Sequence, residues 1–150
     1  MQRVIPALRV TSYRSSKAFY ESLSFREQWT HQFEPGFPTF ASIQREGMEV
    51  FLTEHTGDCQ FGALVHFNVP SVDALYEEFK QRGVTVSELP NNDLGPDIRA
   101  MSILDPDNNR LKFLTIKADW IKVDPTPNPS IERTSSSVLR TLPAAAHVKR

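Results

Sequence analysis

The segment EQWTHQFEPGFPTF, residues 27–40, places aromatic side chains next to polar and ionisable ones. Aromatic faces stack on planar rings, and cationic groups lie favourably over them. A pocket with such walls uses a few polar side chains to orient its ligand. The segment therefore predicts a site for a planar aromatic ligand. The aromatic candidates are Trp29, Phe33, Phe37 and Phe40, and the polar candidates are His31, Gln32 and Glu34.

An alternative for the aromatic residues is a place in the hydrophobic core, where most large apolar side chains lie. Strand alternation places Trp29 and His31 on one face, and only one face of a sheet can line a pocket. Phe33 and Phe37 fall in or beside the EPG turn, where a loop offers them no core to enter. These two loop residues therefore have the stronger claim to bind a ligand.

His66 and Cys59 are of types that can bind a metal or react, but each has a simpler structural explanation. His66, in GALVHFNV, is either the polar wall of a pocket or a satisfied, partly buried histidine, and most histidines are not metal ligands. Cys59 is the sole cysteine, so no intrachain disulfide and no cysteine-rich zinc site can form. No neighbour in the sequence activates its thiol, and we expect it to be inert.

Length and charge limit the possibilities. The chain has 150 residues, enough for one domain with one core, and its net charge of −1 does not indicate a nucleic acid or a membrane surface as partner. Five cationic and three anionic residues lie from position 119 onward, so residues 1–118 carry −3. No apolar run is long enough for a signal peptide or a membrane helix. The expectation is a cytoplasmic protein.

The elements that position these residues follow one order twice. An extended segment at 4–10 precedes a helix that ends near Leu23, capped by Ser15 or Ser16, and three strands follow within 26–54. A strand at 62–69 then precedes a helix with Ser71 as its N-cap and Gly83 at its end. Three strands are predicted after it, at 84–89, 99–105 and 110–116, the last two joined by a DPDNN turn. The pattern is β-α-β-β-β, twice.

The remaining segment, residues 119–150, is rich in Pro, Ser, Thr and Ala and lacks sustained periodicity. It has too few large apolar residues to form a core, and we predict that it is disordered. A protein–protein contact made by this tail is one alternative role for the chain.

The motifs RSSKAFYESLSF and DPDNNRLKF, together with the doubled element order, resemble the vicinal-oxygen-chelate superfamily. This superfamily includes glyoxalase I, extradiol dioxygenases, fosfomycin-modifying enzymes and bleomycin-resistance proteins. The resemblance covers residues 3–117 and implies an α+β fold in which two βαβββ units, about 3–56 and 61–117, form cup-shaped mixed sheets. Ser24 and Asn108 stand where members usually have glycine, and asparagine accepts a positive φ.

The metal-dependent members hold a divalent ion with His, Gln or Glu at fixed strand positions. The corresponding positions here are Ile5, Leu64, Lys112 and, with a looser alignment, Val50. Hydrocarbon side chains donate no lone pair, and an ammonium group repels a cation. The resemblance therefore implies a protein without this metal site and without a cofactor.

The metal-free members most similar to this chain are the bleomycin-resistance proteins. This similarity implies a homodimer that sequesters an aromatic, cationic antibiotic in clefts between subunits, without catalysis. The mild negative charge of residues 1–118 agrees with a cationic ligand. The alternative is an enzyme that lacks the usual metal and acts on a small anionic substrate, with Arg99 and Lys112 holding a carboxylate or phosphate.

Overall fold

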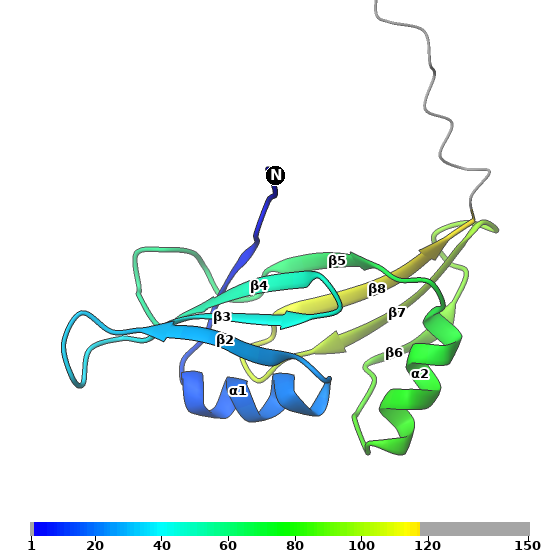
Figure 1. Ribbon diagram of the computed structural model, residues 1–150. Coiled ribbons are helices and arrows are strands. Elements are labelled where there is room, and N and C mark those ends of the chain that lie inside the picture. Colours follow the sequence, from blue (N-terminus) through cyan, green and yellow to red (C-terminus); the bar gives the residue numbers. More distant parts are fainter. Residues whose placement is uncertain (1, 118–150) are drawn as a thin grey trace, which may run out of the picture. The chain divides into compact units, whose positions relative to one another are not determined.

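The computed structural model describes residues 2–117, and the chain divides into two units, Met1–Trp120 and Ile121–Arg150. The predicted disorder of residues 119–150 lies outside the described residues. The first unit repeats β-α-β-β-β twice, as predicted (Figure 1). Its elements are β1 (Ala7–Arg9), α1 (Tyr13–Ser22), β2 (Arg26–His31), β3 (Phe40–Arg45), β4 (Met48–Thr53), β5 (Leu64–Asn68), α2 (Val72–Gln81), β6 (Glu88–Asn91), β7 (Ile98–Leu104) and β8 (Arg110–Ile116).

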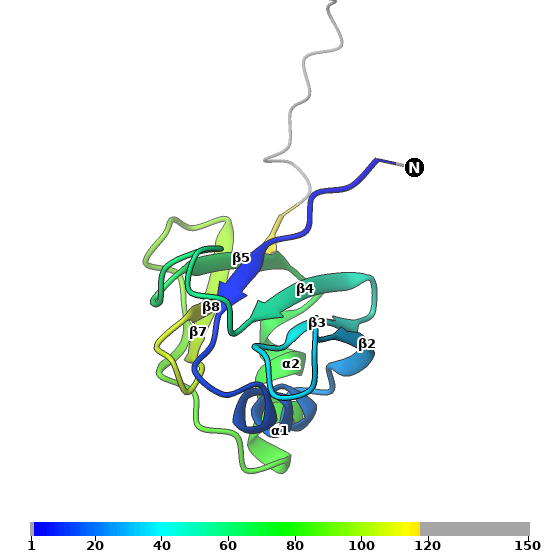
Figure 2. The same cartoon turned by 90° about the vertical axis from the view of Figure 1, so that its left-hand side faces the viewer.

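Each half of the unit builds one four-stranded mixed sheet. Sheet A has the order β1-β4-β3-β2, and sheet B has the order β5-β8-β7-β6. The first strand of each half pairs in parallel with the last, and the other pairs are antiparallel. Figures 1 and 2 both show the two helices beneath the strands. Each sheet therefore has a helix face and a second face without a helix, which we call the open face.

A single hydrophobic core fills the helix side and joins the two halves. In sheet A, Leu8, Ile43 and Leu52 are almost fully buried on the helix face. Sheet B contributes Phe67 and Phe113, whose rings stack with centroids 5.1 Å apart, and other buried members are Val10, Tyr20, Leu23, Phe25, Val50, Leu75, Phe79, Met101, Ile103 and Leu111. Because these residues alternate along their strands, the intervening residues line the open faces.

Helix α2 forms as its sequence predicts. The Ser71 hydroxyl accepts a hydrogen bond from the Ala74 N–H, and Gly83 takes a φ of +71° just beyond the C-cap. For α1 the predicted cap is wrong. Ser12, not Ser15 or Ser16, is the N-cap and accepts from the Ser15 N–H, so the helix begins one turn earlier.

The strand predicted at residues 84–89 is also misplaced. Val84 and Val86 pack against the core from an irregular segment, and β6 begins only at Glu88. The strand β6 contains Pro90, which lies on the outer edge of sheet B, where a missing N–H does no harm.

The DPDNN turn fastens the two halves together. Buried Asp105 accepts hydrogen bonds from the backbone N–H of Asp107 and of Asn109 and from the Tyr20 hydroxyl of α1. Asn109 is fully buried, and its amide donates to the Arg9 carbonyl in β1. This motif therefore has a structural role, which is carried by the side chains of Asp105 and Asn109.

Candidate ligand-binding site

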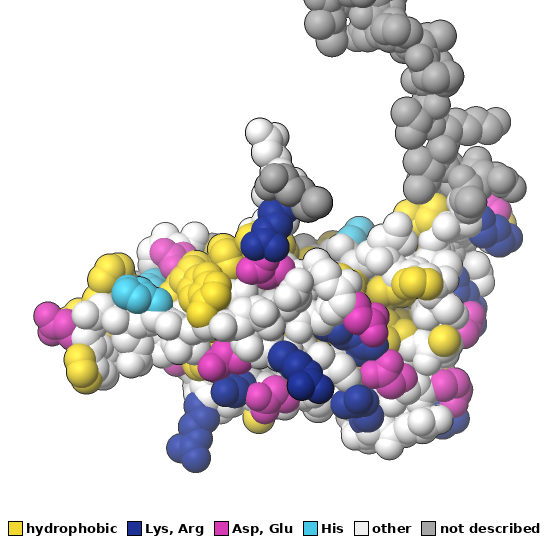
Figure 3. Space-filling view, viewed as in Figure 1, with side chains coloured by type: hydrophobic (Ala, Val, Ile, Leu, Met, Phe, Trp, Pro, Cys, Tyr) yellow, Lys and Arg dark blue, Asp and Glu magenta, His cyan; other side chains and the backbone are white. Residues whose placement is uncertain are grey.

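Three aromatic side chains form a cluster on the open face of sheet A. Strand pairing aligns Trp29 with Ser42 and Ser42 with Phe51, so their side chains share that face. The Trp29 ring lies 5.7 Å from the Phe40 ring and 5.4 Å from the Phe51 ring, centroid to centroid, and Phe40 and Phe51 lie 5.2 Å apart. Trp29 remains 42% exposed. Figure 3 shows hydrophobic side chains gathered beside a histidine over this end of the sheet.

The loop between β2 and β3 extends the aromatic surface. The Phe33 ring meets His31 at 5.0 Å and His55 at 5.8 Å, both edge-on, and Phe33 is 72% exposed. Phe37 is about half exposed. A cavity of about 200 Å³ opens here, lined by His31, Phe33, Phe40, His55 and Asp58.

The polar side chains predicted in this loop have different roles. The Gln32 amide donates to the Phe37 carbonyl at 2.8 Å and to the Thr39 hydroxyl at 3.1 Å, so Gln32 holds the loop in shape. Glu34 is exposed, and its carbonyl accepts from the Phe37 N–H, which closes the EPG turn. Together these contacts hold Phe33 and Phe37 at the end of the open face.

The open face of sheet B carries polar side chains, whereas the open face of sheet A carries aromatic ones. His66 and Lys112 are direct neighbours across the β5–β8 pair, and Ser102 pairs with Lys112 from β7. The Lys112 ammonium lies 3.6 Å from the Glu88 carboxylate, which also accepts from the buried Ser102 hydroxyl at 2.7 Å. The bond from Ser102 and the charge of Lys112 lower the pKa of Glu88, although burial opposes them. Arg110 lies 4.0 Å from the same carboxylate.

Arg99 does not join Lys112. Arg99 pairs with Thr115, three positions from the Ser102–Lys112 pair, so it points to the helix face. There its guanidinium donates to both carboxylate oxygens of Asp73 in α2, at 2.9–3.3 Å. The predicted anion clamp of Arg99 and Lys112 is therefore wrong, because the pleat of β7 separates the two residues.

One of the four family metal positions is also corrected by the structure. Val50 is fully buried on the helix face, opposite Ile43. Ala7 pairs with Phe51 just as His66 pairs with Lys112, so Phe51 is the residue that corresponds to Lys112. The four positions are thus Ile5, Phe51, Leu64 and Lys112.

This donor set does not fit a divalent cation, because three of its side chains are hydrocarbon and the fourth is an ammonium group. Across residues 2–117, no group of three or more His, Cys, Asp or Glu side chains is arranged to hold a metal ion. Burial and the nearby Asp58 raise the pKa of the Cys59 thiol, which favours the unreactive protonated form.

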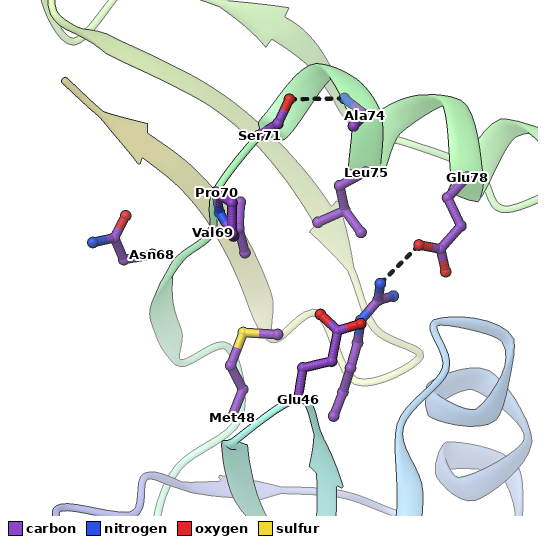
Figure 4. A pocket seen from close by; sticks show the side chains of 10 residues that line it. Glu46, Met48, Asn68, Val69, Pro70, Ser71, Ala74, Leu75 and Glu78 are labelled. Carbon is purple, nitrogen blue, oxygen red and sulfur yellow. Dashed lines mark hydrogen bonds and ion pairs between the residues drawn. The ribbon is translucent and has the colours of Figure 1, made fainter.

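A larger cavity of about 350 Å³ lies on the helix side, between the β3–β4 turn and the start of α2. In Figure 4, Glu46 and Met48 lie across it from Leu75 and Glu78 of α2. Arg45 closes one wall by donating to the Glu78 carboxylate and to the Leu23 carbonyl, each at 2.7 Å. The charged pair here joins the two halves, so we assign this cavity a structural origin.

The acidic residues lie only partly on the open faces. Glu21 of α1 and Asp73, Glu77 and Glu78 of α2 lie with the helices, whereas Asp58 lines the cavity beside the aromatic residues. The net charge of residues 1–118 therefore gives little support to a cationic ligand. The charged strand residues on the two open faces are Arg9, Arg26, Arg110 and Lys112 against Glu49 and Glu88, a net charge of +2.

Phe51 and Glu88 lie at the candidate site but are not among the residues that the sequence predicts there. Phe51 completes the aromatic cluster, and alternation in MEVFLTE was the available signal, since Val50 and Leu52 are the apolar pair that faces the core. Glu88 was placed in a predicted strand without a role. Its pairing with Ser102 depends on the position of β6, which the sequence did not reveal.

Comparison with known proteins agrees with this architecture. A family model described as glyoxalase superfamily protein matches residues 1–119. No curated protein sequence matches the chain significantly. Within the described residues, no helix is both long enough and apolar enough to cross a membrane.

Solved structures with the same fold include antibiotic-binding proteins. A bleomycin resistance determinant encoded on transposon Tn5 has a TM-score of 0.63 and 18% identity, over 78% of this chain and 99% of that one. A bleomycin-binding protein complexed with bleomycin has a TM-score of 0.59 and 20% identity, over 77% and 98%. TnmS3, an antibiotic binding protein from Streptomyces sp. CB03234, has a TM-score of 0.61 and 20% identity, over 77% and 97%. The TM-scores establish a shared fold, and the family match over residues 1–119 shows that the chain belongs to the glyoxalase superfamily.

Proposed function

We propose that the protein is a non-catalytic binding protein of the bleomycin-resistance type, which sequesters a planar aromatic compound in the cytoplasm. The observation that carries the proposal is the aromatic cluster of Trp29, Phe40 and Phe51 on an open sheet face, in which Trp29 is 42% exposed. The exposed part of such a cluster offers area that a stacked aromatic ring can cover. Three structural neighbours that bind or resist antibiotics support the ligand class.

The proposal includes a homodimer. Within residues 2–117 no helix covers the open face of either sheet, and each face forms only one wall of a site. Ligand pockets enclose most of a small molecule's surface, which one flat wall cannot do. A second copy that sets its sheet B against sheet A would give a cleft with an aromatic wall and a polar wall.

The proposal that the protein does not catalyse a reaction rests on the residue types at the site. The four positions where metal-dependent relatives hold their ion carry Ile5, Phe51, Leu64 and Lys112. The Cys59 thiol is held protonated, and Glu88 is bound by Ser102 and Lys112. The side chains at the site thus offer contact and charge, with no activated nucleophile among the described residues.

Two ligands test the proposal. Metal-free bleomycin is titrated by calorimetry, and the neutral probe N-phenyl-1-naphthylamine is titrated by its fluorescence. We expect one ligand per chain with a dissociation constant of about 10 μM or tighter for at least one of them. Trp29→Ala should weaken that binding at least tenfold, because stacking on one aromatic residue is worth roughly 1–3 kcal/mol. No binding of either compound, or binding indifferent to Trp29→Ala, would remove the aromatic site.

The second candidate function is an enzyme that acts on a small anionic substrate without the family metal. It is favoured by one observation, that Lys112 and His66 are cross-strand neighbours on the open face. The two functions differ in what happens to the compound. A ligand recovered unchanged, by mass spectrometry after overnight incubation, is expected for sequestration, and conversion to a product would favour the enzyme.

A further inference from the structure

We propose that the open face of sheet B recognises an oxyanion carried by the aromatic ligand, a carboxylate, sulfonate or phosphate, with Lys112 as its main contact. The inference rests on the proposed function, because it concerns the second wall of the same cleft. It specifies the ligand class as aromatic anions and replaces the cationic ligand that the sequence suggested.

The charges on this wall do not cancel. Glu88 is its single acidic strand residue, and that carboxylate faces two cations, Lys112 at 3.6 Å and Arg110 at 4.0 Å. Ser102, fully buried, fixes the carboxylate by donating to the same oxygen that Lys112 approaches. The charged strand residues of this face therefore carry a net charge of +1.

The position of Lys112 makes that charge effective. Its side chain is only 16% exposed, whereas Arg110 is half exposed, so solvent screens Lys112 less. His66 lies beside it on β5, and the open face around them also carries Leu64 and Leu114. An ammonium group that is largely shielded from solvent binds an anion more strongly than one in bulk water.

The acidic groups of helix α2 lie on the other side of sheet B. Asp73 is bound to Arg99 on the helix face, Glu78 is bound to Arg45 there, and Glu77 lies 3.9 Å from Lys80 of the same helix. Asp105 is buried in the turn and accepts from Tyr20 and Asn109. Repulsion of an anion by these carboxylates is screened by the sheet and the core.

A matched pair of probes isolates the anion. 1-Anilinonaphthalene-8-sulfonate and N-phenyl-1-naphthylamine share the same aromatic skeleton and differ by the sulfonate. We expect the sulfonate to bind at least tenfold more tightly to the wild-type protein. Lys112→Met should remove about tenfold of its affinity and change that of the neutral probe less than twofold, since a hydrogen bond to a charged group contributes roughly 1.5–3 kcal/mol.

Two further variants serve as controls. Lys112→Arg keeps the charge and should keep the preference for the sulfonate. Lys117→Met removes a lysine that is 68% exposed near the end of the same strand and pairs with Asp97, and it should leave both affinities unchanged. Circular dichroism melts of all variants identify any that fail to fold.

The outcomes separate the inference from the proposed function. Equal affinity for both probes in the wild type, or a preference that survives Lys112→Met, overturns the inference and leaves the aromatic site standing if Trp29→Ala still weakens both. Failure of both probes and of bleomycin to bind overturns the proposed function and the inference with it.

Discussion

At the residue scale, several ionisable side chains among residues 2–117 hold the backbone in place. Glu54 is the clearest case. Its two carboxylate oxygens accept from the backbone N–H of Tyr13, the first residue of α1, and of Thr39, just before β3, both at 2.7 Å. Burial raises the pKa of Glu54, but these two bonds outweigh it and the net shift is downward. A charged group in such a position is structural and is not available as a base.

This shift predicts how stability changes with pH. The folded pKa of Glu54 lies below its unfolded value of about 4.3, so its contribution is complete above that value and is lost as the pH falls through the folded pKa. Glu54→Gln should cost about 1–3 kcal/mol at pH 7 and less at pH 3. Urea unfolding at both values measures this difference, with the exposed Glu77→Gln as the control. An equal loss at both pH values would show that the charge of Glu54 contributes nothing.

The candidate site residues that the sequence predicts are those whose type alone is informative. Trp29, His31 and Phe33 are candidates because aromatic and imidazole groups stand out in a short polar segment, and their role in binding stays a prediction. Arg99 was misjudged because its role depends on which face of β7 it occupies, and a strand reverses that face at every residue. Phe51 was missed for the same reason, since Val50 and Phe51 differ by one position.

At the element scale, the turn between β3 and β4 shows what local sequence decides. Its two central residues, Glu46 and Gly47, have φ values of +48° and +83°. Positive φ at both positions is the type I′ geometry that matches the twist of a hairpin. Glutamate is an uncommon choice for the first position, because a side chain with a Cβ is strained there.

Glu46→Asn should therefore stabilise the protein by about 0.5–1 kcal/mol, since asparagine tolerates positive φ better. The thermal midpoint measures the gain. Gly47→Ala is the opposite control and should destabilise by about 1 kcal/mol or more, because alanine is strained at +83°. A Glu46→Asn protein that melts no higher than the wild type would show that the turn is not strained.

A helix or strand is predicted correctly where several local sequence signals point to the same boundaries. Helix α2 has a capping serine, an apolar stripe of Val72, Leu75 and Phe79, and a terminal glycine, and all three signals were correct. In α1 three serines precede the apolar stripe, so the sequence offered several caps. The segment VTVS has the composition of a strand, yet Val84 and Val86 pack against the core from a loop. This packing depends on the tertiary structure, so the local sequence does not predict it.

At the scale of the whole unit, the two halves share one core and are fastened by buried polar contacts. The Tyr20 hydroxyl donates to Asp105 at 2.9 Å across the two halves. Burial and the charge of Asp105 raise the pKa of Tyr20, so the hydroxyl stays a donor over the whole physiological range. Arg45 and Glu78 make a second link, at 2.7 Å.

Removing the first link tests whether the halves depend on each other. Tyr20→Phe leaves the buried Asp105 carboxylate without one of its donors and should lower the free energy of unfolding by about 1–3 kcal/mol. The unfolding should remain a single transition by both circular dichroism and Trp fluorescence. Two separated transitions in the wild-type protein would show that the halves fold independently.

The proposed dimer is tested by light scattering coupled to size-exclusion chromatography. We expect twice the chain mass, because each open face supplies only one wall of the cleft. A monomer across the concentration range would require one chain alone to enclose the ligand, and the account of the two walls would then be wrong.

The most direct test of the central claim observes Trp29 itself. In a Trp120→Phe background, Trp29 gives the one indole N–H signal in a ¹⁵N-correlated spectrum. Titration with metal-free bleomycin and with 1-anilinonaphthalene-8-sulfonate should move that signal by the ring current of a stacked ligand, with saturation at one ligand per chain for at least one of them. A Trp29 signal that stays in place through both titrations would contradict the proposal that this aromatic cluster binds the ligand.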